Sequence, residues 1–368
     1  MLKRKKLNKI LKLLILSLIL ISITIAPVQA ALEVHFIDVG QGDSILIQED
    51  KKVNILIDGG DRWNAVEDKV LSYLRKNDVE TIDALISTHP HADHIGSLEA
   101  VINNFDVEAV YDSGRVHTSK TYENYLIAID ENNISFDTPR KGENISVEGL
   151  NFEVLHPESP VEDYDLNNSS LVLRLQYGEV SFLFTGDIEH EVEQEIINSG
   201  LNLDSDILKV AHHGNKTSSS KNFIEKVSPE VGVITVGEDN KFGHPNQKTL
   251  GVLSSEAVKV YRTDKNGDIV VETDGNSYSI NASRKDNVDV KSVQEEIELD
   301  KKDNSNLINI NTASKGKLDV LWGIGPATAE KIINYREKNG PFKSIEEIKN
   351  VNGIDVKKFN KWKHKITI

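Results

Sequence analysis

The sequence predicts a mixed α/β (α+β) fold for most of the chain, with a smaller domain after a linker. Between residues 31 and 282, apolar runs of strand length alternate with segments of helical spacing. Residues 283–305 are polar and charged and contain almost no large apolar side chain, so they are expected to be a flexible linker. With 368 residues, the chain is long enough for two domains and a sizeable core.

The apolar pattern places the elements in order along residues 31–282. It begins as strand, turn, strand, with the turn at Gly40–Asp43, and turns at Tyr177–Glu179 and Asp274–Asn276 separate later strand pairs. Apolar residues at helical spacing, such as Val66 and Leu74, predict the helices. The expected strands are residues 34–37, 44–47, 54–57, 84–88, 109–111, 145–147, 152–155, 171–175, 180–184, 207–210 and 231–236, with two more near Lys259 and Ile269. The expected helices are residues 66–76, 95–103, 121–132, 191–198, 221–227 and 247–255.

Residues 1–30 are expected to be a secretory signal peptide. A basic start at Lys3–Lys6 precedes an apolar run at Leu13–Ile25, and Val28–Ala30 provides a small-residue cleavage site. The alternative is an uncleaved membrane anchor, but an apolar run of 13 residues is short for a span. We therefore expect a secreted protein without a stable membrane span.

Charge is unevenly distributed along the chain. The leader has a formal charge of +6, and residues 307–368 also have +6, from 12 Lys or Arg against 6 Asp or Glu. Because the whole chain has −15, residues 31–306 carry −27. An acidic body repels polyanions and a basic tail attracts them, so the tail would have to supply any affinity for nucleic acid.

The segment Thr88–Gly96 carries the strongest chemical signal. His89 and His91 are two residues apart, so on an extended backbone their side chains point to the same side. Asp93 and His94 follow where a helical pattern begins. Imidazole and carboxylate together suit zinc, manganese or iron, and the chain has no cysteine to supply a thiolate. This spacing predicts a metal site rather than solvated loop histidines.

Together with its neighbours, this segment resembles the metal signature of the metallo-β-lactamase fold. Phe36–Ile47, Leu56–Gly60, Phe184–Asp187 and His212–Gly214 follow the order found in the extracytoplasmic hydrolase domain of ComEC-type DNA-uptake proteins. The resemblance implies an αββα sandwich over residues 31–282, whereas periodicity alone gives only α/β or α+β. It also implies a metal-dependent hydrolase without fixing the substrate.

The resemblance assigns His89 and His91 to one metal and Asp93 and His94 to a second. Asp187 would bridge them, although an aspartate there could instead cap the next helix. Two further candidates are His212 and His213. Adjacent histidines on a strand point in opposite directions, so only one of them is expected to be a ligand, and the sequence does not decide which.

The sequence departs from the superfamily pattern where a third histidine would complete the first metal. Asn168 stands there, and His156 is a nearby substitute or an ordinary loop histidine. His244 falls near the last histidine position and is a candidate ligand or substrate contact. The departure predicts a weakly held first metal or a harder ion, so the expected cofactor is zinc, two per site, or manganese.

Metals held in this way would activate water for attack on phosphorus or a carbonyl. The catalytic residues expected are Asp93, Asp187 and Asp58, the last as the partner of a histidine ring N–H. Asp43 could act similarly or simply form a turn. Lys209 is a candidate phosphate contact, with a solvated surface lysine as the alternative.

Residues 306–368 resemble the helix-hairpin-helix DNA-binding domain of ComEA-type competence proteins, which implies a small all-α fold. Gly323 and Gly325 allow a tight hairpin before a helix, whose N–H groups and dipole bind phosphate without reading bases. A second hairpin has Asp355 where the motif usually has glycine, so that hairpin is expected to be structural. The residues expected at the DNA are Gly323, Ile324, Gly325, Ala327, Lys331, Arg336 and Lys343.

The leading hypothesis is therefore a secreted metal-dependent phosphodiesterase or nuclease, related to competence, that acts on DNA held by residues 306–368. One alternative is a hydrolase of a small or cell-envelope phosphoester or a lactone. The other is a DNA-binding uptake protein whose metal site is degenerate at Asn168. The sequence leaves the oligomeric state open.

Overall fold

The computed structural model describes residues 31–284 and most of residues 307–368. It separates the chain into two compact units, of residues 1–290 and 291–368, which we call the larger and the smaller unit. The expected leader, and the expected linker from residue 285 onward, lie outside the described residues. Within residues 307–368, the positions not described are 314, 316–317, 319–320, 322–323, 325, 355–358, 360–362 and 364–365.

The first sheet of the larger unit has eight strands in the order β17-β16-β1-β2-β3-β5-β7-β8. From β17 to β3 neighbouring strands run antiparallel, and from β3 to β8 they run parallel. The strands are β1 (Leu32–Phe36), β2 (Ile45–Glu49), β3 (Val53–Ile57), β5 (Ala84–Ser87), β7 (Ala109–Asp112), β8 (Ser135–Asp137), β16 (Ile269–Thr273) and β17 (Tyr278–Ala282).

The second sheet has seven strands in the order β15-β14-β13-β12-β11-β10-β9 and is also half antiparallel and half parallel. Strands β9 to β12 alternate in direction, and β12 to β15 run parallel. A separate two-stranded pair joins β4 (Thr81–Ile82) to β6 (Asp106–Val107). The strands of the second sheet are β9 (Asn144–Val147), β10 (Leu150–His156), β11 (Val172–Tyr177), β12 (Val180–Phe184), β13 (Ile207–Lys209), β14 (Val231–Ile234) and β15 (Lys259–Arg262).

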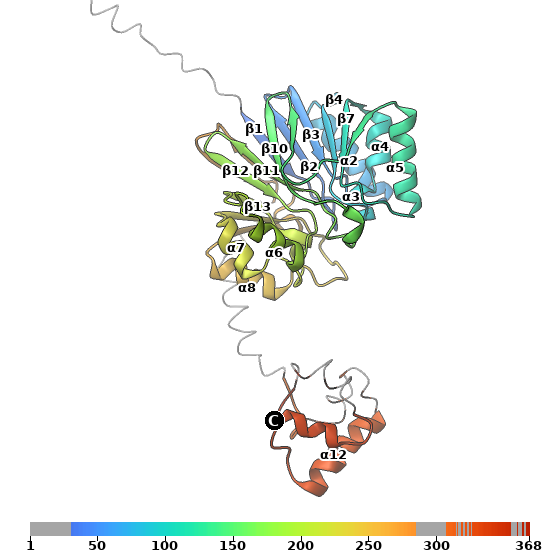
Figure 1. The fold of residues 1–368 in the computed structure, drawn as a ribbon, viewed down its shortest axis with the longest axis vertical. Coiled ribbons are helices and arrows are strands. Elements are labelled where there is room, and N and C mark those ends of the chain that lie inside the picture. The colour runs from blue at the N-terminus through green and yellow to red at the C-terminus, as the bar shows by residue number, and fades with distance from the viewer. Residues whose placement is uncertain are drawn as a thin grey trace, which may run out of the picture. The chain divides into compact units, whose positions relative to one another are not determined.

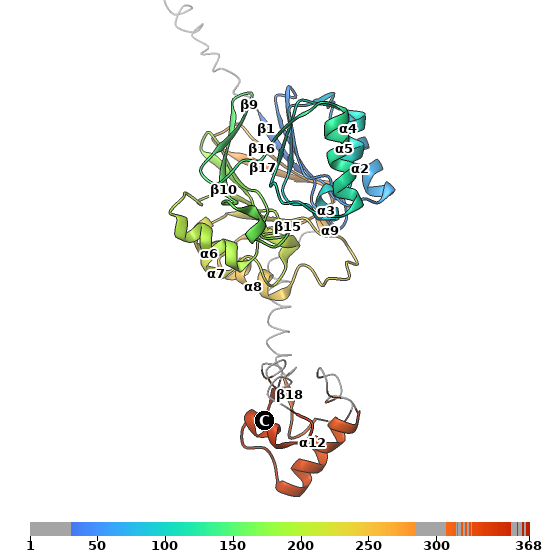
Figure 2. The same ribbon diagram turned by 45° about the vertical axis from the view of Figure 1, so that its right-hand side comes forward.

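The two sheets face each other and helices cover the outside, which confirms the αββα sandwich (Figures 1 and 2). Alternating side chains explain the layers: Ile47 packs in the core between the sheets, whereas its neighbour Leu46 packs in a second core under the helices. In that second core lie residues of α2 (Asn64–Lys76), α4 (Leu98–Asn104) and α5 (Lys120–Glu131). Beside the second sheet lie α6 (His190–Ser199), α7 (Lys221–Val227) and α8 (Gln247–Ser255).

One expected helix is divided. The pattern predicts a single helix over residues 95–103, but the structure forms α3 (Ala92–Ile95) and α4, separated at Gly96. The N–H of Gly96 donates to the carbonyl of Gly60, and a Cβ at Gly96 would lie 2.1 Å from the backbone N of Arg62. This close approach requires glycine and draws the chain away from a continuous helix.

The smaller unit has its own core, which includes Leu318, Ile332 and Phe342. Its elements are a parallel pair of β18 (Ile308–Asn309) with β19 (Ile366–Thr367), the helix α12 (Pro326–Asn339) and a 3-10 helix at Ile345–Asn350.

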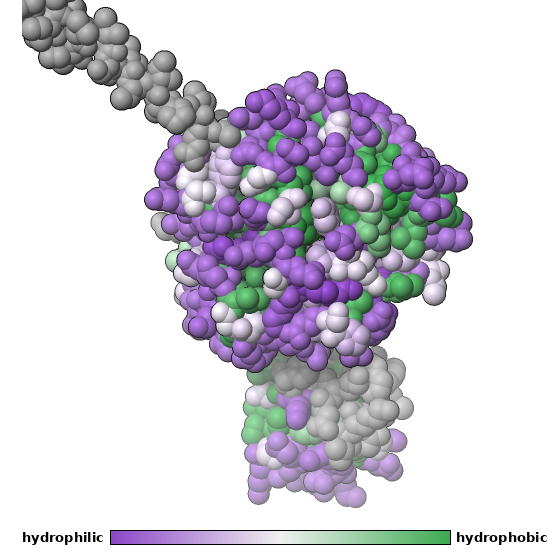
Figure 3. Space-filling view, turned by 45° about the horizontal axis from the view of Figure 1, so that its top comes forward, coloured by the Kyte–Doolittle hydropathy of each residue, from purple (hydrophilic) through white to green (hydrophobic). Residues whose placement is uncertain are grey.

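The face of the molecule in Figure 3 is mostly hydrophilic. Few large apolar side chains are exposed, among them Trp63, Val116, Phe136 and Phe242. Of the helices in the described residues, none has the length and apolar character needed to cross a membrane.

Candidate metal centre

The candidate ligands lie at the carboxyl ends of parallel strands from both sheets. In the first sheet, Asp58 follows β3 and His89 comes two residues after β5. In the second sheet, Asp187 follows β12, and His213 lies in the turn after β13. Because parallel strands bring their carboxyl ends to one edge, segments distant in sequence meet there.

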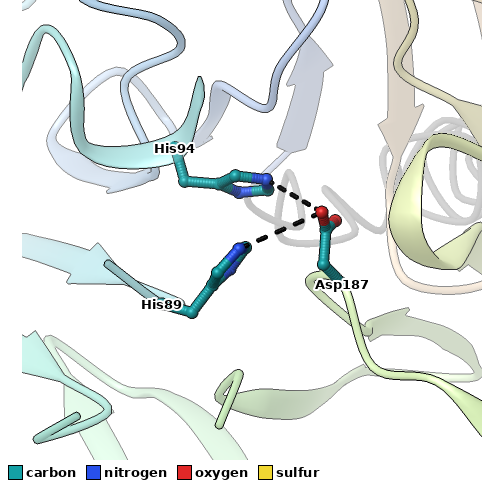
Figure 4. Close-up of side chains that lie close together, drawn as sticks. All are labelled: His89, His94 and Asp187. Atoms are coloured by element: carbon teal, nitrogen blue, oxygen red, sulfur yellow. Dashed lines mark ion pairs between the residues drawn. The ribbon is translucent and has the colours of Figure 1, made fainter. Parts of the chain in front are cut away.

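Asp187 lies at the centre of this group. Its Oδ2 atom is 3.3 Å from Nε2 of His94, 3.5 Å from Nε2 of His213, 3.9 Å from Nε2 of His212 and 4.0 Å from Nε2 of His89. Figure 4 shows the rings of His89 and His94 turned toward this carboxylate. Helix α6 begins at His190 with Glu189 as its N-cap, so the helix-cap alternative for Asp187 is wrong.

His91 and Asp93 extend the cluster on either side. Nε2 of His89 lies 3.0 Å from Nδ1 of His91, and Oδ2 of Asp93 lies 3.4 Å from Nε2 of His213. His91 and Asp93 are partly exposed, whereas His89 is fully buried. The cluster therefore opens to solvent on the side of His91 and Asp93.

Three buried atoms in the cluster have no hydrogen-bond partner within the described part of the chain: Nε2 of His94, Nε2 of His213 and Oδ1 of Asp187. Buried polar atoms are almost always satisfied, and leaving one unpaired is costly. Ligand atoms of His89, His94 and Asp187 lie within 4.8 Å of one another, as do those of Asp93, His94 and His213. Imidazole nitrogens and carboxylate oxygens at such separations fit a divalent cation.

Asp58 fixes the orientation of His94. Its carboxylate is fully buried and accepts hydrogen bonds from the backbone N–H of Thr88 at 2.8 Å and from the Thr88 hydroxyl at 2.6 Å. Nδ1 of His94 lies 2.8 Å from Oδ2 of Asp58. In the neutral ring, a proton on Nδ1 leaves the lone pair on Nε2, the atom that faces Asp187, available to a metal ion.

The backbone at the site is held in an uncommon conformation. His212, His213 and Asp58 have φ of 50°, 53° and 57°, in the left-handed region. Such residues cost on the order of 1–2 kcal/mol each and cluster at functional sites. Because His212 and His213 lie in a 3-10 turn and not on a strand, the expectation that they point apart does not apply, and both Nε2 atoms approach Asp187.

A buried ion pair between Lys209 and Asp43 lies next to His213. No sequence motif predicts that these two residues pair. Nζ of Lys209 is 2.7 Å from Oδ2 of Asp43, and both side chains are at most 2% exposed. The Thr235 hydroxyl donates to Oδ1 of Asp43, and Nδ1 of His213 lies 2.9 Å from the carbonyl of Thr235. Lys209 is therefore not a solvated surface lysine, and its ammonium group is engaged with Asp43.

Ser170 is a further residue at the site, and no sequence motif points to it. Its hydroxyl accepts a 3.0 Å hydrogen bond from the backbone N–H of Asp187 and lies 3.3 Å from Nδ1 of His89. It thereby connects two candidate ligands that come from different sheets. A serine among several serines and asparagines carries no signal of such a role.

Carboxylates determine the protonation of the buried rings. Burial alone would lower the pKa of His94, but Asp187 and Asp58 outweigh it and raise that pKa well above its usual range. Burial likewise opposes the charge on His213, but Asp187 and Asp43 raise its pKa to about 10. For His89, burial and the nearby His94 cation hold the pKa well below its usual value.

We therefore expect binding of zinc to release protons. The raised pKa values of His94 and His213 favour the protonated rings at neutral pH in the absence of metal, and a histidine must lose its proton at the ligating nitrogen to bind a metal. Calorimetric titration should give a binding enthalpy that changes with the ionisation enthalpy of the buffer, and the affinity should rise from pH 6 to pH 8. A His190→Gln variant, changed outside the cluster, should behave identically. A binding enthalpy that is the same in every buffer would contradict the prediction.

Three predicted candidates lie beside the cluster or away from it. The side-chain Oδ1 of Asn168 accepts a 2.9 Å hydrogen bond from the backbone of Glu189, and its backbone carbonyl lies 2.7 Å from Nε2 of His156. The Asn168 amide is thus engaged with Glu189 and Asp165, and the His156 ring with the Asn168 backbone. The ring of His244 lies 5.6 Å from that of His212, and its Nδ1 is buried without a partner among the described residues.

The residues of the smaller unit that are predicted to contact DNA differ from one another in exposure and in their partners. Lys331 on α12 and Lys343 after it are exposed. The guanidinium of Arg336 donates to the carbonyls of Ile310 and Ala313, at 2.7 and 2.9 Å, so it joins two segments of the unit. Ile324 is buried and Ala327 lies in the first turn of α12. Gly323, Gly325 and Asp355 lie outside the described residues.

Comparison with known families agrees with both units. Residues 37–238 match the metallo-beta-lactamase superfamily, and residues 303–367 match the helix-hairpin-helix motif. Because the first match covers more than half of the chain, the protein belongs to the metallo-beta-lactamase superfamily. Both resemblances expected from the motifs are confirmed.

Within this superfamily the chain is similar to ComEC-type competence proteins. ComE operon protein 3 of Bacillus subtilis (strain 168) is 37% identical over 253 residues, 64% of this chain and 32% of that protein. Competence protein ComA of Neisseria gonorrhoeae is 30% identical over 237 residues, 62% of this chain and 30% of that protein. A separate and shorter match is to ComE operon protein 1 of Bacillus subtilis (strain 168), which is 52% identical over 62 residues, 17% of this chain and 30% of that protein. The chain thus spans about a third of the length of the curated relatives it matches.

Proposed function

We propose that this protein is an extracytoplasmic metal-dependent phosphodiesterase that cleaves DNA bound by its smaller unit. The observation that supports it most is a set of buried atoms of His94, His213 and Asp187 at one edge of the sandwich, which have no hydrogen-bond partner among the residues the structure describes. A divalent cation held there supplies Lewis acidity and a nucleophile at neutral pH. His89, His91, Asp93 and Asp187 complete the set of residues that would hold one or two such ions.

Other residues around the site have supporting roles. Asp58 keeps the proton of His94 on Nδ1. The ion pair of Asp43 with Lys209 holds the buried residues next to His213 in place. Asp93, which is partly exposed, is the carboxylate best placed to exchange a proton with a substrate or product at the open side.

The smaller unit would provide affinity for DNA. Residues 31–290, within the larger unit, carry a formal charge of −25, which disfavours a polyanion there. The match of residues 303–367 to the helix-hairpin-helix motif, and the exposed Lys331 and Lys343, support phosphate contacts that do not depend on base sequence.

Charge reversal in the smaller unit tests this division. We expect Lys331→Glu combined with Lys343→Glu to weaken plasmid cleavage and to lower the salt dependence of DNA binding by about two units of the log–log slope. Hydrolysis of a small chromogenic phosphodiester by the same variant should not change. The measurements are plasmid nicking with added zinc or manganese at several salt concentrations, and hydrolysis of the small substrate.

The matched control reverses two exposed lysines of the larger unit, Lys76→Glu with Lys226→Glu, and so changes net charge equally. Equal loss in both variants would reject a specific role for the smaller unit. A wild-type protein that cleaves no phosphodiester with either metal would reject the proposed activity itself. If such a protein still binds plasmid, a DNA-binding uptake protein is favoured instead.

A second candidate follows from the acidic charge of the larger unit. A small or cell-envelope phosphoester would meet less repulsion than DNA. Cleavage of the small substrate with an intact plasmid would favour this candidate.

A further inference from the structure

An exposed aromatic side chain lies next to the metal centre. The loop of residues 235–246 connects β14 to α8 and carries Phe242, which is 58% exposed. The ring of Phe242 lies 5.7 Å from that of His244 at an interplanar angle of 25°, and the ring of His244 lies 5.6 Å from that of His212. Phe242 is thus separated from a candidate ligand by a single ring.

The loop is held rigidly although its aromatic residue is not buried. Nδ2 of Asn240 donates to the carbonyls of Gly237 and His244, at 2.9 and 2.6 Å. Oδ1 of Asn240 accepts from the backbone N–H groups of Phe242 and His244, at 3.2 and 3.0 Å. A Cβ at Gly237 would lie 2.7 Å from the backbone N of Gln41, so this end of the loop is packed against the Gly40–Asp43 turn. These contacts hold the loop in a conformation that exposes the Phe242 ring to solvent.

A cation accompanies the ring. Nζ of Lys241 lies 5.5 Å from the centroid of Phe242. The acidic residues of the same loop are Glu238, which faces Lys265 at 3.9 Å, and Asp239. Charge alone therefore gives this loop little attraction for a polyanion, whereas an exposed ring beside an ammonium group can bind a base and its phosphate together.

We propose that Lys241, Phe242 and His244 form a base-stacking platform that selects nucleic acid with unpaired bases, and hence single-stranded DNA, for the metal centre. The proposal rests on the phosphodiesterase function above and specifies its substrate. Every base has a face that can stack on an aromatic ring, so the platform tolerates any sequence. In a duplex those faces are covered by neighbouring base pairs, so a duplex cannot use the platform without unstacking.

The test compares two single strands of equal length, one with bases and one built of abasic sites, as substrates of the full metal-loaded chain. We expect Phe242→Ala to raise KM for the strand with bases about tenfold more than for the abasic strand, with a smaller effect on kcat. Phe242→Trp should restore KM. Phe136→Ala, which removes an exposed phenylalanine from β8, is the control and should leave both substrates unaffected.

Equal changes on the two strands, or no change, would overturn the platform. If the wild type cleaves neither strand, the phosphodiesterase function fails, and the platform is then tested by binding. The fluorescence of 2-aminopurine in a single strand should be quenched by the wild-type chain and by Phe136→Ala, and much less by Phe242→Ala. Equal quenching by all three proteins would reject stacking on Phe242.

Discussion

Replacing Asp187 with Asn should lower phosphodiester hydrolysis by at least about a hundredfold and remove tightly bound metal. The carboxylate Oδ2 lies 3.3–4.0 Å from the Nε2 atoms of four histidines, so the loss affects the whole cluster. Asn keeps the shape but removes the negative charge, and the imidazoles then face one another and a bound cation without compensation. The measurements are metal content after dialysis and the rate on a small phosphodiester.

The control for this substitution is Asp163→Asn, which changes an exposed carboxylate at the end of a 3-10 helix. It should retain both metal and activity. An Asp187→Asn protein that is folded by circular dichroism and hydrolyses the substrate at the wild-type rate would contradict the central place given to Asp187.

Replacing Lys209 with Met should destabilise the larger unit by about 3–5 kcal/mol, because it leaves the Asp43 carboxylate buried without its partner. Although burial opposes ionisation of Asp43, the Lys209 ammonium keeps the pKa of Asp43 well below its usual range. Removing the ammonium leaves a buried carboxylate whose remaining partners include the Thr235 hydroxyl and the His213 ring, whose Nδ1 lies 3.4 Å from Oδ1 of Asp43. Pulse proteolysis of the full chain in urea gives the free energy of unfolding.

Two further variants complete this test. Lys259→Met removes an exposed lysine from β15 of the same sheet and should change stability by less than about 0.5 kcal/mol. Combining Lys209→Met with Asp43→Asn should recover part of the loss, since the pair is then removed together. If Lys209→Met unfolds at the same urea concentration as Lys259→Met, the buried ion pair does not contribute to stability.

The sequence predicted most strands and helices because their apolar patterns are local. It could not predict which strands pair, since residues 53–57 and 84–87 are joined in a parallel ladder by contacts that periodicity does not encode. The αββα arrangement therefore came from the resemblance. The helix divided at Gly96 shows the same limit: the break depends on a contact with Arg62, which precedes it by more than thirty residues.

In the candidate site, too, residues close together in sequence are predictable, whereas contacts between distant segments are not. His89 and His94 are predictable because their spacing is local. The sequence around Asp43 is equally typical of a turn, and only the fold brings Lys209 and Thr235 beside it. For His213, the expectation assumed strand geometry, whereas the structure has a left-handed turn that depends on packing.

Each of the two sheets provides candidate ligands to the site at the edge of the sandwich. His89 and His94 follow a strand of the first sheet, and Asp187 and His213 follow strands of the second. An ion held by both sets would cross-link the sheets, and its binding free energy would add to the cohesion of the sandwich. Any substitution that loosens the core between the sheets, however far from the site, would then also weaken the hold on the ion.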